Sequence, residues 1–330
     1  PTNPVPAASA PGPYGRVEGN NKILRGENKP ICDRALAQWW CNGCKSQVSC
    51  GQRHTALLTT QGLLYTFGHG EGGRLGHGNQ NTMTVPCVVQ YFLDRSIPIT
   101  DVACGALHTL AVTAAGEAYS WGWGEGGRLG IGQTVQELAP KSVHKLRSKG
   151  IKVVSVACGG EHSLFISSDG QLFSCGVNAH GQLGHGGTRD CNNPQPVRDE
   201  LANVKVAGAA GGLAHTVVCT TDGDVFSWGF GESGALGHGH FESCDLPRRM
   251  QSFASYHVDG QRIQIVQVAC GQYFTLARDA WGGGWSWGDG ALGQLGTLEM
   301  DRIAAQDDRL QTPHKVQLPF LGEDNSSDGQ

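Results

Sequence analysis

Five copies of one block of residues follow each other along this chain of 330 residues. The first copy starts at Cys50 and ends with a Gly-Arg-Leu-Gly element. The leucine of that element falls at Leu75, Leu129, Leu183, Leu236 and Leu295, so the spacing is 54, 54, 53 and 59 residues. A period near 50 with glycine-rich punctuation is typical of a repeat architecture. A residue type that returns in every copy is therefore expected to build the fold rather than to perform chemistry once.

Composition supports a β-protein with many tight turns. Glycine supplies 50 of the residues without a three-residue period, and charged residues make up only 16%. The net charge of −4 argues against a general nucleic-acid or anionic-membrane binder. No apolar run approaches the length of about 18 residues that a membrane span needs. Residues 1–15 lack the charged head and apolar core of a signal peptide.

Each block contains four runs that favour β-strands, because β-branched and aromatic residues stand between glycine and proline clusters. In the second copy these runs are residues 99–103, 109–113, 117–121 and 142–146. A short turn with glycine, which takes positive φ at no steric cost, joins the middle two runs. A proline precedes the fourth run, at Pro86, Pro140, Pro196, Pro247 and Pro313, where it suits the first residue of an edge strand. The pattern predicts an all-β fold, a β-propeller of five four-stranded antiparallel blades.

The order Val-Ala-Cys-Gly-x-x-His-Thr, Tyr-Ser-Trp-Gly, Gly-x-Leu-Gly-x-Gly and Pro-x-x-Val resembles the regulator-of-chromosome-condensation repeat family over roughly residues 46–318. The resemblance implies a β-propeller, usually with seven blades. Residues 1–45 contain Pro30 but no Gly-x-Leu-Gly, so we assign them to an N-terminal extension or a degenerate sixth blade. Residues 46–320 hold the repeats and 321–330 a polar tail. A five- or six-bladed ring, an open ring and a fragment all stay open.

One histidine position recurs in four copies, at His54, His108, His162 and His215, and Phe274 replaces it in the fifth. A ring of histidines could relay protons or hold a metal. Alternatively, each imidazole packs between blades with a ring nitrogen bonded to backbone. Phe274 favours the packing interpretation, because it shows that an apolar ring fills the slot. The glycine-rich loops at residues 68–73 and 122–127 precede no helix, so phosphate binding is not expected there.

Four cysteines also hold one repeat position, at Cys50, Cys104, Cys158 and Cys270. We expect them one per blade, as small buried hydrophobes too far apart for disulfides. Outside the repeats, Cys32, Cys41 and Cys44 are weak candidates for zinc, with unliganded thiols as the favoured alternative. No metal or other cofactor is predicted. Cysteine usage predicts an intracellular, reducing compartment, the cytoplasm first and the nucleus or an organelle as alternatives.

Departures from the repeat supply the candidate partner-binding residues. A basic run without an intervening acid could be a solvated loop or a docking patch, and it lacks the aromatic residues that stack on nucleic-acid bases. It comprises Lys141, Lys145, Arg147, Lys149 and Lys152. Two insertions, residues 251–267 and 297–312, are either neutral drift or binding loops. They carry Tyr256, His257, Arg262, Asp301, Arg302, Asp307, Asp308 and Arg309. We also expect residues 33–40, with Trp39 and Trp40, to pack onto the propeller as a strand or short helix.

No catalytic motif stands out, so the chain is not predicted to be an enzyme. The resemblance implies three roles: nucleotide exchange on small GTPases, chromatin binding, and ultraviolet sensing through clustered tryptophans. The light-sensing members place tryptophan where this chain has Gln52, Ala106, Gly160, Leu213 and Gln272. The negative net charge weakens the chromatin role. We therefore predict a protein–protein interaction scaffold in a larger assembly, with exchange factor or regulator of a small GTPase as the alternative. Nothing in the sequence points to a homo-oligomer.

Overall fold

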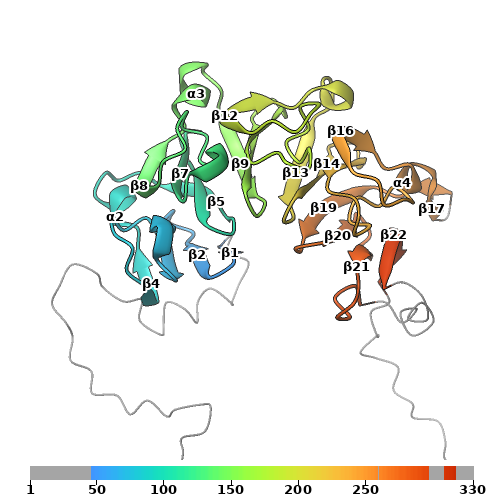
Figure 1. Cartoon of the computed structure of the whole chain (residues 1–330), viewed down its shortest axis with the longest axis horizontal. Coiled ribbons are helices and arrows are strands. Elements are labelled where there is room, and N and C mark those ends of the chain that lie inside the picture. The colour runs from blue at the N-terminus through green and yellow to red at the C-terminus, as the bar shows by residue number, and fades with distance from the viewer. Residues whose placement is uncertain (1–45, 259, 297–307, 317–330) are drawn as a thin grey trace, which may run out of the picture.

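The computed structural model describes residues 46–258, 260–296 and 308–316. These residues form five four-stranded antiparallel sheets and one two-stranded hairpin, which confirms the predicted class of fold. We number the four-stranded sheets blades 1 to 5 in chain order. Figure 1 shows the blades standing side by side in an arc, with blade 1 at one open end and blade 5 at the other.

Every blade is a meander in which consecutive strands pair. Blades 1 and 2 comprise β1 (Gln47–Cys50), β2 (His54–Leu58), β3 (Leu64–Gly68), β4 (Met83–Val88), β5 (Ile99–Cys104), β6 (His108–Thr113), β7 (Ala118–Gly122) and β8 (Glu137–Ser142). Blades 3 and 4 comprise β9 (Val153–Cys158), β10 (His162–Ser167), β11 (Leu172–Gly176), β12 (Cys191–Pro196), β13 (Val206–Gly211), β14 (His215–Thr220), β15 (Val225–Gly229) and β16 (Cys244–Arg249). Blade 5 comprises β19 (Ile265–Cys270), β20 (Phe274–Asp279), β21 (Gly284–Asp289) and β22 (Arg309–Lys315). The first strand of each blade is innermost, since β5 lies against both β1 and β9.

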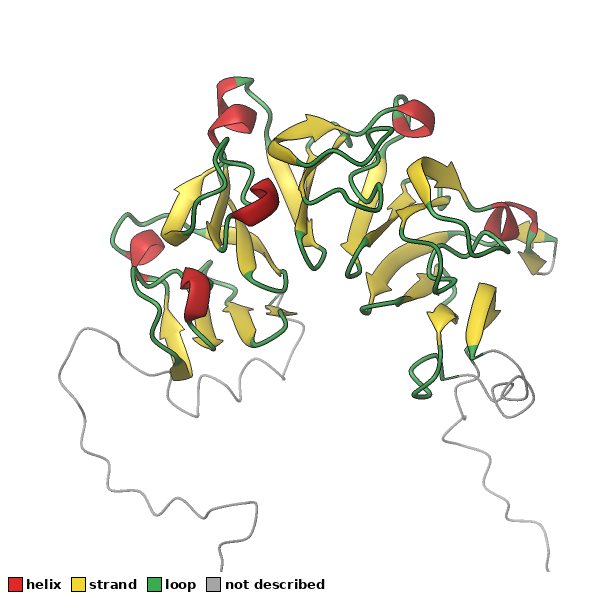
Figure 2. Cartoon of the chain, viewed as in Figure 1, coloured by secondary structure: helices red, strands yellow, loops and turns green. Residues whose placement is uncertain are grey.

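Short helices link the outer strand of one blade to the inner strand of the next. They are α2 (Gln90–Leu93), α3 (His144–Ser148), η3 (Asp199–Leu201) and α4 (Gln251–Ser255), while η1 (Glu71–Gly73) and η2 (Glu125–Gly127) lie in the loops before the outer strands. Figures 1 and 2 place α3 and α4 on the outer rim of the arc. Each linking helix buries one large apolar side chain. These side chains are Phe92, Leu146, Leu201 and Phe253.

Three details of the predicted strands are wrong. Residues 142–146 do not form the fourth strand of blade 2, because β8 ends at Ser142 and α3 follows, turning Leu146 into the core. The repeated proline lies inside the outer strand rather than before it, at a register shift where no ladder donor is needed. Register also shows that Pro194, three residues after Cys191, holds this position in blade 3, not Pro196.

The glycine after each repeated cysteine is required by close packing. A Cβ atom on Gly105 would lie 2.3 Å from His108 Cε1 and 2.9 Å from the carbonyl oxygen of Gly159. In blade 5 a Cβ on Gly271 would meet the ring of Phe274 at 1.9 Å, so the phenylalanine occupies the space that the imidazole fills elsewhere. The prediction that an apolar ring fits this slot is confirmed.

One hydrogen-bond pattern joins neighbouring blades. Between blades 3 and 4, the Thr216 hydroxyl donates to the Gln182 carbonyl oxygen at 2.8 Å, and Trp228 Nε1 donates to the same oxygen at 2.9 Å. His162 Nε2 lies 2.8 Å from Thr216 Oγ1. Because the hydroxyl has already given its proton to the carbonyl, the imidazole must be the donor. His162, Thr216 and Trp228 are fully buried, so these hydrogen bonds replace contacts with water, while His162 Nδ1 has no hydrogen-bond partner among the described residues.

The same contact recurs at the other described junctions. The pairs are His54 with Thr109, His108 with Ser163, and His215 with Thr275, at 2.9, 2.9 and 3.2 Å. Trp121 and Trp287 repeat the role of Trp228, whereas Cys175 stands in that place between blades 2 and 3. The buried apolar residues divide in the same way, into clusters that each span one junction. The predicted bond from histidine to backbone is wrong, because the partner is a hydroxyl of the next blade.

Removing one junction hydroxyl should destabilise the fold. Thr216→Val keeps the shape of the side chain but leaves the buried His162 N–H without an acceptor, which costs about 1–3 kcal/mol of unfolding free energy. Urea denaturation measures this. Thr134→Val, in an exposed loop, is the control and should change stability by less than about 0.5 kcal/mol. Equal stabilities of the two variants would refute the role of the junction.

Candidate functional site

The blade topology creates two different faces. Antiparallel strand order brings the β1–β2 type turns and the β3–β4 type loops of all blades to one face, which we call the hub face. The turns between second and third strands and the linking helices lie on the opposite face, the hairpin face. Loops held on a rigid scaffold are common binding sites, so both faces are candidates.

A hollow of about 280 Å³ opens at the hub, where the first turns of the five blades meet. Cys50, Cys104, Cys158 and Cys270 line it, each from a different blade. All four are free thiols, as predicted. The predicted burial holds only for Cys104, because Cys158 and Cys270 are half-buried and Cys50 is exposed. Burial raises the pKa of Cys104 and of Cys270 to about 12. Since the thiolate is the reactive form, these two thiols suit packing rather than chemistry.

An aromatic row crosses blades 3, 4 and 5 on the hub face. The ring centroid of Phe230 lies 5.0 Å from that of His180 and 6.0 Å from that of Tyr273. Leu213 lies in the adjacent turn, and Leu292 of the β21–β22 loop is 92% exposed. We call these five residues the hub-face aromatic patch. It presents apolar surface to solvent beside the hub hollow, which Leu213 also lines.

Backbone hydrogen bonds fix the loops that carry this patch. The amide of Phe230 donates to the carbonyl of Ala214 at 2.9 Å, and the amide of Leu213 donates to Gln272 at 2.9 Å. The amide of Asp289 donates to the carbonyl of Tyr273 at 3.0 Å. The patch is therefore held in place before any partner arrives, which lowers the entropic cost of binding.

The aromatic patch was not predicted from the sequence. The sequence does contain a signal for it. Phe230 directly follows the third-strand glycine that recurs in every copy. At the same position the other copies have His69, Trp123, Val177 and Asp289. The slot varies between copies, while its neighbours repeat. A position whose residue type differs between the copies of a strict repeat is not required by the fold and is therefore available for binding.

Over blades 1 and 2 the hub face is polar instead. The guanidinium of Arg128 is almost fully buried and lies 3.3 Å from Glu161 Oε1, while its Nε donates to the Glu125 carbonyl at 2.8 Å. Arg74 repeats this arrangement with Glu71. Trp123 is partly exposed, and its Nε1 donates to Glu125 Oε2 at 3.0 Å. The hub face thus has a charged half and an aromatic half.

The predicted basic run is partly neutralised by its own blade. Lys141 Nζ lies 2.7 Å from Glu137 Oε1, and Arg147 Nε lies 3.1 Å from Glu117 Oε1. The acids come from β8 and from the turn before β7, so the sequence of the run itself could not reveal them. Lys145, Lys149 and Lys152 lie on α3 or just after it. Lys149 borders a hairpin-face hollow of about 410 Å³ with Arg198, over Ile151, Phe173 and Leu201.

The first insertion is folded rather than a loop. It forms α4 and the hairpin of β17 (His257–Val258) with β18 (Gln261–Arg262). Arg262 Nη1 lies 2.6 Å from Asp224 Oδ1 and holds the hairpin to blade 4. The Tyr256 ring packs edge-on against Trp285 at 5.1 Å. Two of the three predicted contact residues, Tyr256 and Arg262, therefore have structural contacts. The third, His257, is exposed, and its Nδ1 lies 2.9 Å from the carbonyl oxygen of the nearby Ser255.

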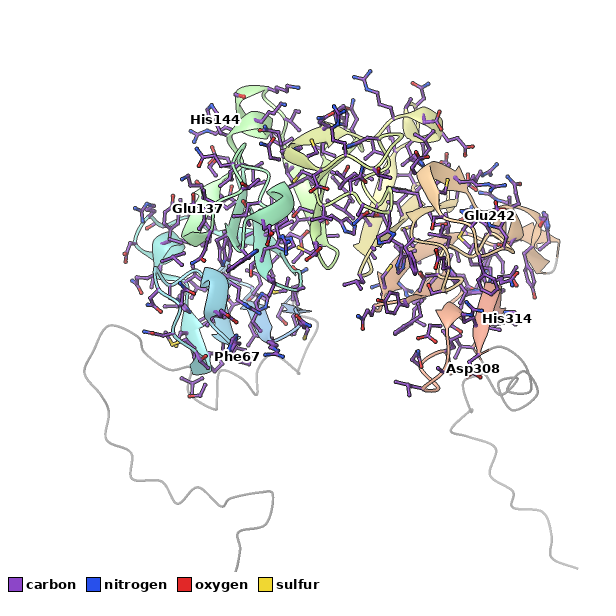
Figure 3. The ribbon with its side chains drawn as sticks, in the orientation of Figure 1. Phe67, Glu137, His144, Glu242, Asp308 and His314 are labelled. Atoms are coloured by element: carbon purple, nitrogen blue, oxygen red, sulfur yellow. The ribbon has the colours of Figure 1, made fainter. Side chains whose placement is uncertain are left out.

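Part of the second insertion is also described. Arg309 Nη1 donates to the Glu232 carbonyl at 2.8 Å, and its guanidinium lies 4.2 Å from the Phe241 ring centroid. Asp308 is exposed at the start of β22, near the open end of blade 5 in Figure 3. The remaining predicted residues lie outside the described part of the chain. They are Trp39, Trp40, Asp301, Arg302, Asp307, Cys32, Cys41 and Cys44.

The junction histidines are neutral at physiological pH. Burial lowers the pKa of His54 and His162 to about 3 and that of His215 to about 4. A second histidine set, missed in the sequence although Leu-Gly-His-Gly recurs, hydrogen-bonds to hydroxyls within its own blade. It comprises His77, His185 and His238. Among the described residues, no three His, Cys, Asp or Glu side chains are grouped to hold a metal ion.

The model of the RCC1-like domain matches residues 41–327 of this chain, which is most of its length. The chain belongs to the RCC1-like domain family. Human E3 ubiquitin-protein ligase HERC2 is 35% identical over 254 residues, 76% of this chain and 5% of HERC2. The ultraviolet-B receptor UVR8 of Arabidopsis thaliana is 34% identical over 271 residues, 82% of this chain and 57% of UVR8. This RCC1-like chain therefore spans less than two thirds of either relative.

Structural similarity agrees with the family. The crystal structure of human WBSCR16 superposes with a TM-score of 0.69 and 28% sequence identity, covering 83% of this RCC1-like chain and 67% of WBSCR16. In the described ranges of the chain, no helix is both long and apolar enough to cross a membrane.

Acid should destabilise this RCC1-like chain, because its junction histidines bind protons in the unfolded chain but not in the folded one. In the unfolded chain a histidine binds a proton near pH 6.5, but the folded pKa of His162 is about 3. The folded state is therefore at full stability above pH 6.5 and loses stability as the pH falls from 6.5 toward 3. At pH 5 the loss is about 2 kcal/mol for each such histidine. Urea denaturation at pH 7.5 and 5.0 measures it.

His162→Phe isolates one proton, because phenylalanine fills the same slot in blade 5. At pH 7.5 the variant should lose only about 0.5–1.5 kcal/mol for the missing hydrogen bond. Its further loss between pH 7.5 and 5.0 should be smaller than the wild-type loss by about 2 kcal/mol. Thr216→Val keeps the imidazole and is the matched control. If His162→Phe and the wild type lose the same amount, the junction histidines do not cause the acid sensitivity.

Proposed function

We propose that this RCC1-like chain is a non-enzymatic interaction module that binds a partner protein through the hub-face aromatic patch, as a subunit or adaptor of a larger assembly. The observation that carries the proposal is the row of His180, Phe230 and Tyr273, with Leu213 and Leu292, on loops fixed by backbone hydrogen bonds. Aromatic residues are enriched at protein interfaces, and a few buried anchors supply most of the binding energy.

The repeat-level residues support a binding role rather than catalysis. The four junction histidines are buried and neutral, and of the hub thiols Cys104 is buried and Cys270 half-buried, both with a raised pKa. Trp121, Trp228 and Trp287 each donate to a backbone carbonyl of the neighbouring blade, which is a structural task. Relatives named as a ubiquitin ligase and as an ultraviolet-B receptor carry this domain in proteins of different activity, which favours a shared binding role.

The hub face is preferred over the hairpin face for a physical reason. Two of the five basic residues on the hairpin side and rim are paired with carboxylates of their own blade, and exposed ion pairs contribute little energy. Desolvation of aromatic side chains contributes more. The hub-face patch also spans three blades, so a partner there would contact several loops at once.

Substitutions on the two faces should separate the sites. A photo-crosslinking residue in place of Leu292 in the native cells should capture the partner, while one in place of Trp281 on the hairpin face should not. Phe230→Ser and Tyr273→Ser should then each raise the dissociation constant for that partner at least about tenfold. Trp281→Ser, which removes a 56% exposed aromatic ring, is the control and should leave it unchanged. A larger effect of Trp281→Ser would contradict the proposal.

Nucleotide exchange on a small GTPase stays the alternative prediction. The hub-face patch would then contact the GTPase, and the chain would accelerate release of bound guanine nucleotide. Release of a fluorescent guanine nucleotide from a panel of small GTPases tests this. Acceleration that Phe230→Ser removes would establish the exchange role, whereas no acceleration for any member of the panel would eliminate it.

A further inference from the structure

Blade 3 lacks a carboxylate that both neighbouring blades carry. The residue directly before the third strand is Glu117 in blade 2 and Asp224 in blade 4, but Gln171 in blade 3. In all three blades its carbonyl oxygen accepts a backbone amide across the turn, at 3.0, 2.9 and 2.9 Å, so the positions are equivalent. Blade 3 therefore has a neutral amide between two blades that hold a negative charge.

In blades 2 and 4 this carboxylate pairs with cations of the chain itself. Glu117 Oε1 lies 3.1 Å from Arg147 Nε. Asp224 Oδ1 lies 2.7 Å from Arg249 Nη2 and 2.6 Å from Arg262 Nη1. The charges on this side of blades 2 and 4 are thus matched within the fold.

The hairpin-face hollow of blade 3 has cations but no such partner for them. Gln171 lines this hollow of about 410 Å³ together with Lys149 and Arg198. Lys149 lies in the link before blade 3, where α3 packs against β12 (Figure 1), and Arg198 lies in the link after it. Both cations are exposed, and among the described residues neither side chain has an ion pair or hydrogen bond.

The acids nearest in sequence do not supply the missing charge. The carboxylate of Asp169 accepts the hydroxyl of Ser167, and Glu200 Oε2 accepts the backbone amide of Arg249 at 3.1 Å. Neither these two acids nor Asp199 is among the described residues that line the hollow. Its described lining therefore carries two positive charges and no negative one.

We propose that this hollow binds a short acidic segment of a partner protein. A carboxylate of the segment lies between Lys149 and Arg198, where the neighbouring blades use their own carboxylate, and a large apolar side chain beside it packs on Ile151 and Phe173. A guanidinium presents paired N–H groups that match a carboxylate. The volume lies within the range of about 300–1,000 Å³ that is usual for binding pockets. This inference does not rest on the hub-face patch.

Backbone hydrogen bonds hold the walls of the hollow in place. The amide of Val197 donates to the carbonyl of Leu172 at 2.8 Å, and the amide of Ile151 donates to the carbonyl of Leu146 at 3.0 Å. A site that is ordered before its ligand arrives has a lower entropic cost of binding.

Phosphate ligands fit the hollow less well. Phe173 is the one aromatic residue of the described lining and is only 4% exposed, so no ring is available to stack on a nucleic-acid base. Anionic membranes are recognised by clusters of about 4–8 lysines and arginines, and the described lining has two. The net charge of −4 also opposes an extended polyanion.

A phage library of random peptides tests the hollow. The library is selected on the full chain and depleted on Lys149→Glu/Arg198→Glu, which removes peptides that bind elsewhere, the hub face included. Enriched peptides should carry Asp or Glu next to Leu, Ile, Phe or Met. The absence of such peptides would overturn the proposal. So would single-stranded RNA or phosphatidylserine vesicles that bind through Lys149 and Arg198 when no peptide does.

An enriched peptide, labelled with fluorescein, is then the probe for affinity. Lys149→Glu and Arg198→Glu should each raise its dissociation constant at least about tenfold. Lys145→Glu and Lys152→Glu make the same change of charge outside the hollow and should each raise it less than about threefold, because salt screens distant charges. Equal effects of the four substitutions would show attraction by overall charge alone and would overturn the proposal.

Gln171→Glu gives the sharpest single test, because it supplies the carboxylate that blades 2 and 4 have. It should raise the dissociation constant of the probe at least about tenfold, whereas the neutral Gln171→Met should leave it within about threefold. Gln171 is exposed, so Tm of both variants should stay within about 2 °C of the wild-type value. Equal affinities of the two variants would contradict a carboxylate ligand.

Discussion

The structure depends on one buried carbonyl oxygen at each junction between blades. At Gln182 this oxygen accepts hydrogen bonds from the hydroxyl of Thr216 and the indole of Trp228, both from the next blade. The imidazole of His162 donates a further hydrogen bond to the hydroxyl of Thr216. A buried carbonyl or hydroxyl group that is left without a hydrogen-bond partner costs free energy. This requirement fixes histidine, threonine or serine, and tryptophan in register, and it explains why these residues recur.

The proposed binding site uses positions that the junctions do not. Tyr273 stands directly before the histidine slot, and Phe230 directly after the third-strand glycine. Both lie on loops that backbone hydrogen bonds fix in place. The two end faces of the arc differ from each other. Blade 1 keeps Val48 and Thr55, the residue types that contact a preceding blade elsewhere in the arc. Blade 5 has Phe274 in place of the junction histidine and Arg278 in place of an apolar residue. A strict repeat with local exceptions thus separates structure from recognition.

The sequence predicted the fold well because each blade carries its own local signals. Glycine turns and alternating strands placed most of the second blade to within a residue or two, but α3 was mistaken for strand because Leu146 fits either period. The site was predicted poorly. Charge partners such as Glu117 for Arg147 come from another strand, and the row of His180, Phe230 and Tyr273 joins three blades. Only the folded arc brings such residues together.

Hydrogen exchange of the chain with and without its native partner tests the central claim most directly, that the junctions build the fold and the variable hub-face slots bind. The account predicts that the partner slows exchange in the hub-face segments around Phe230 and Tyr273. Exchange in the hairpin-face turns around Gly223 and Gly282 should not change. Protection confined to the hairpin-face turns, with none around Phe230 and Tyr273, would contradict it.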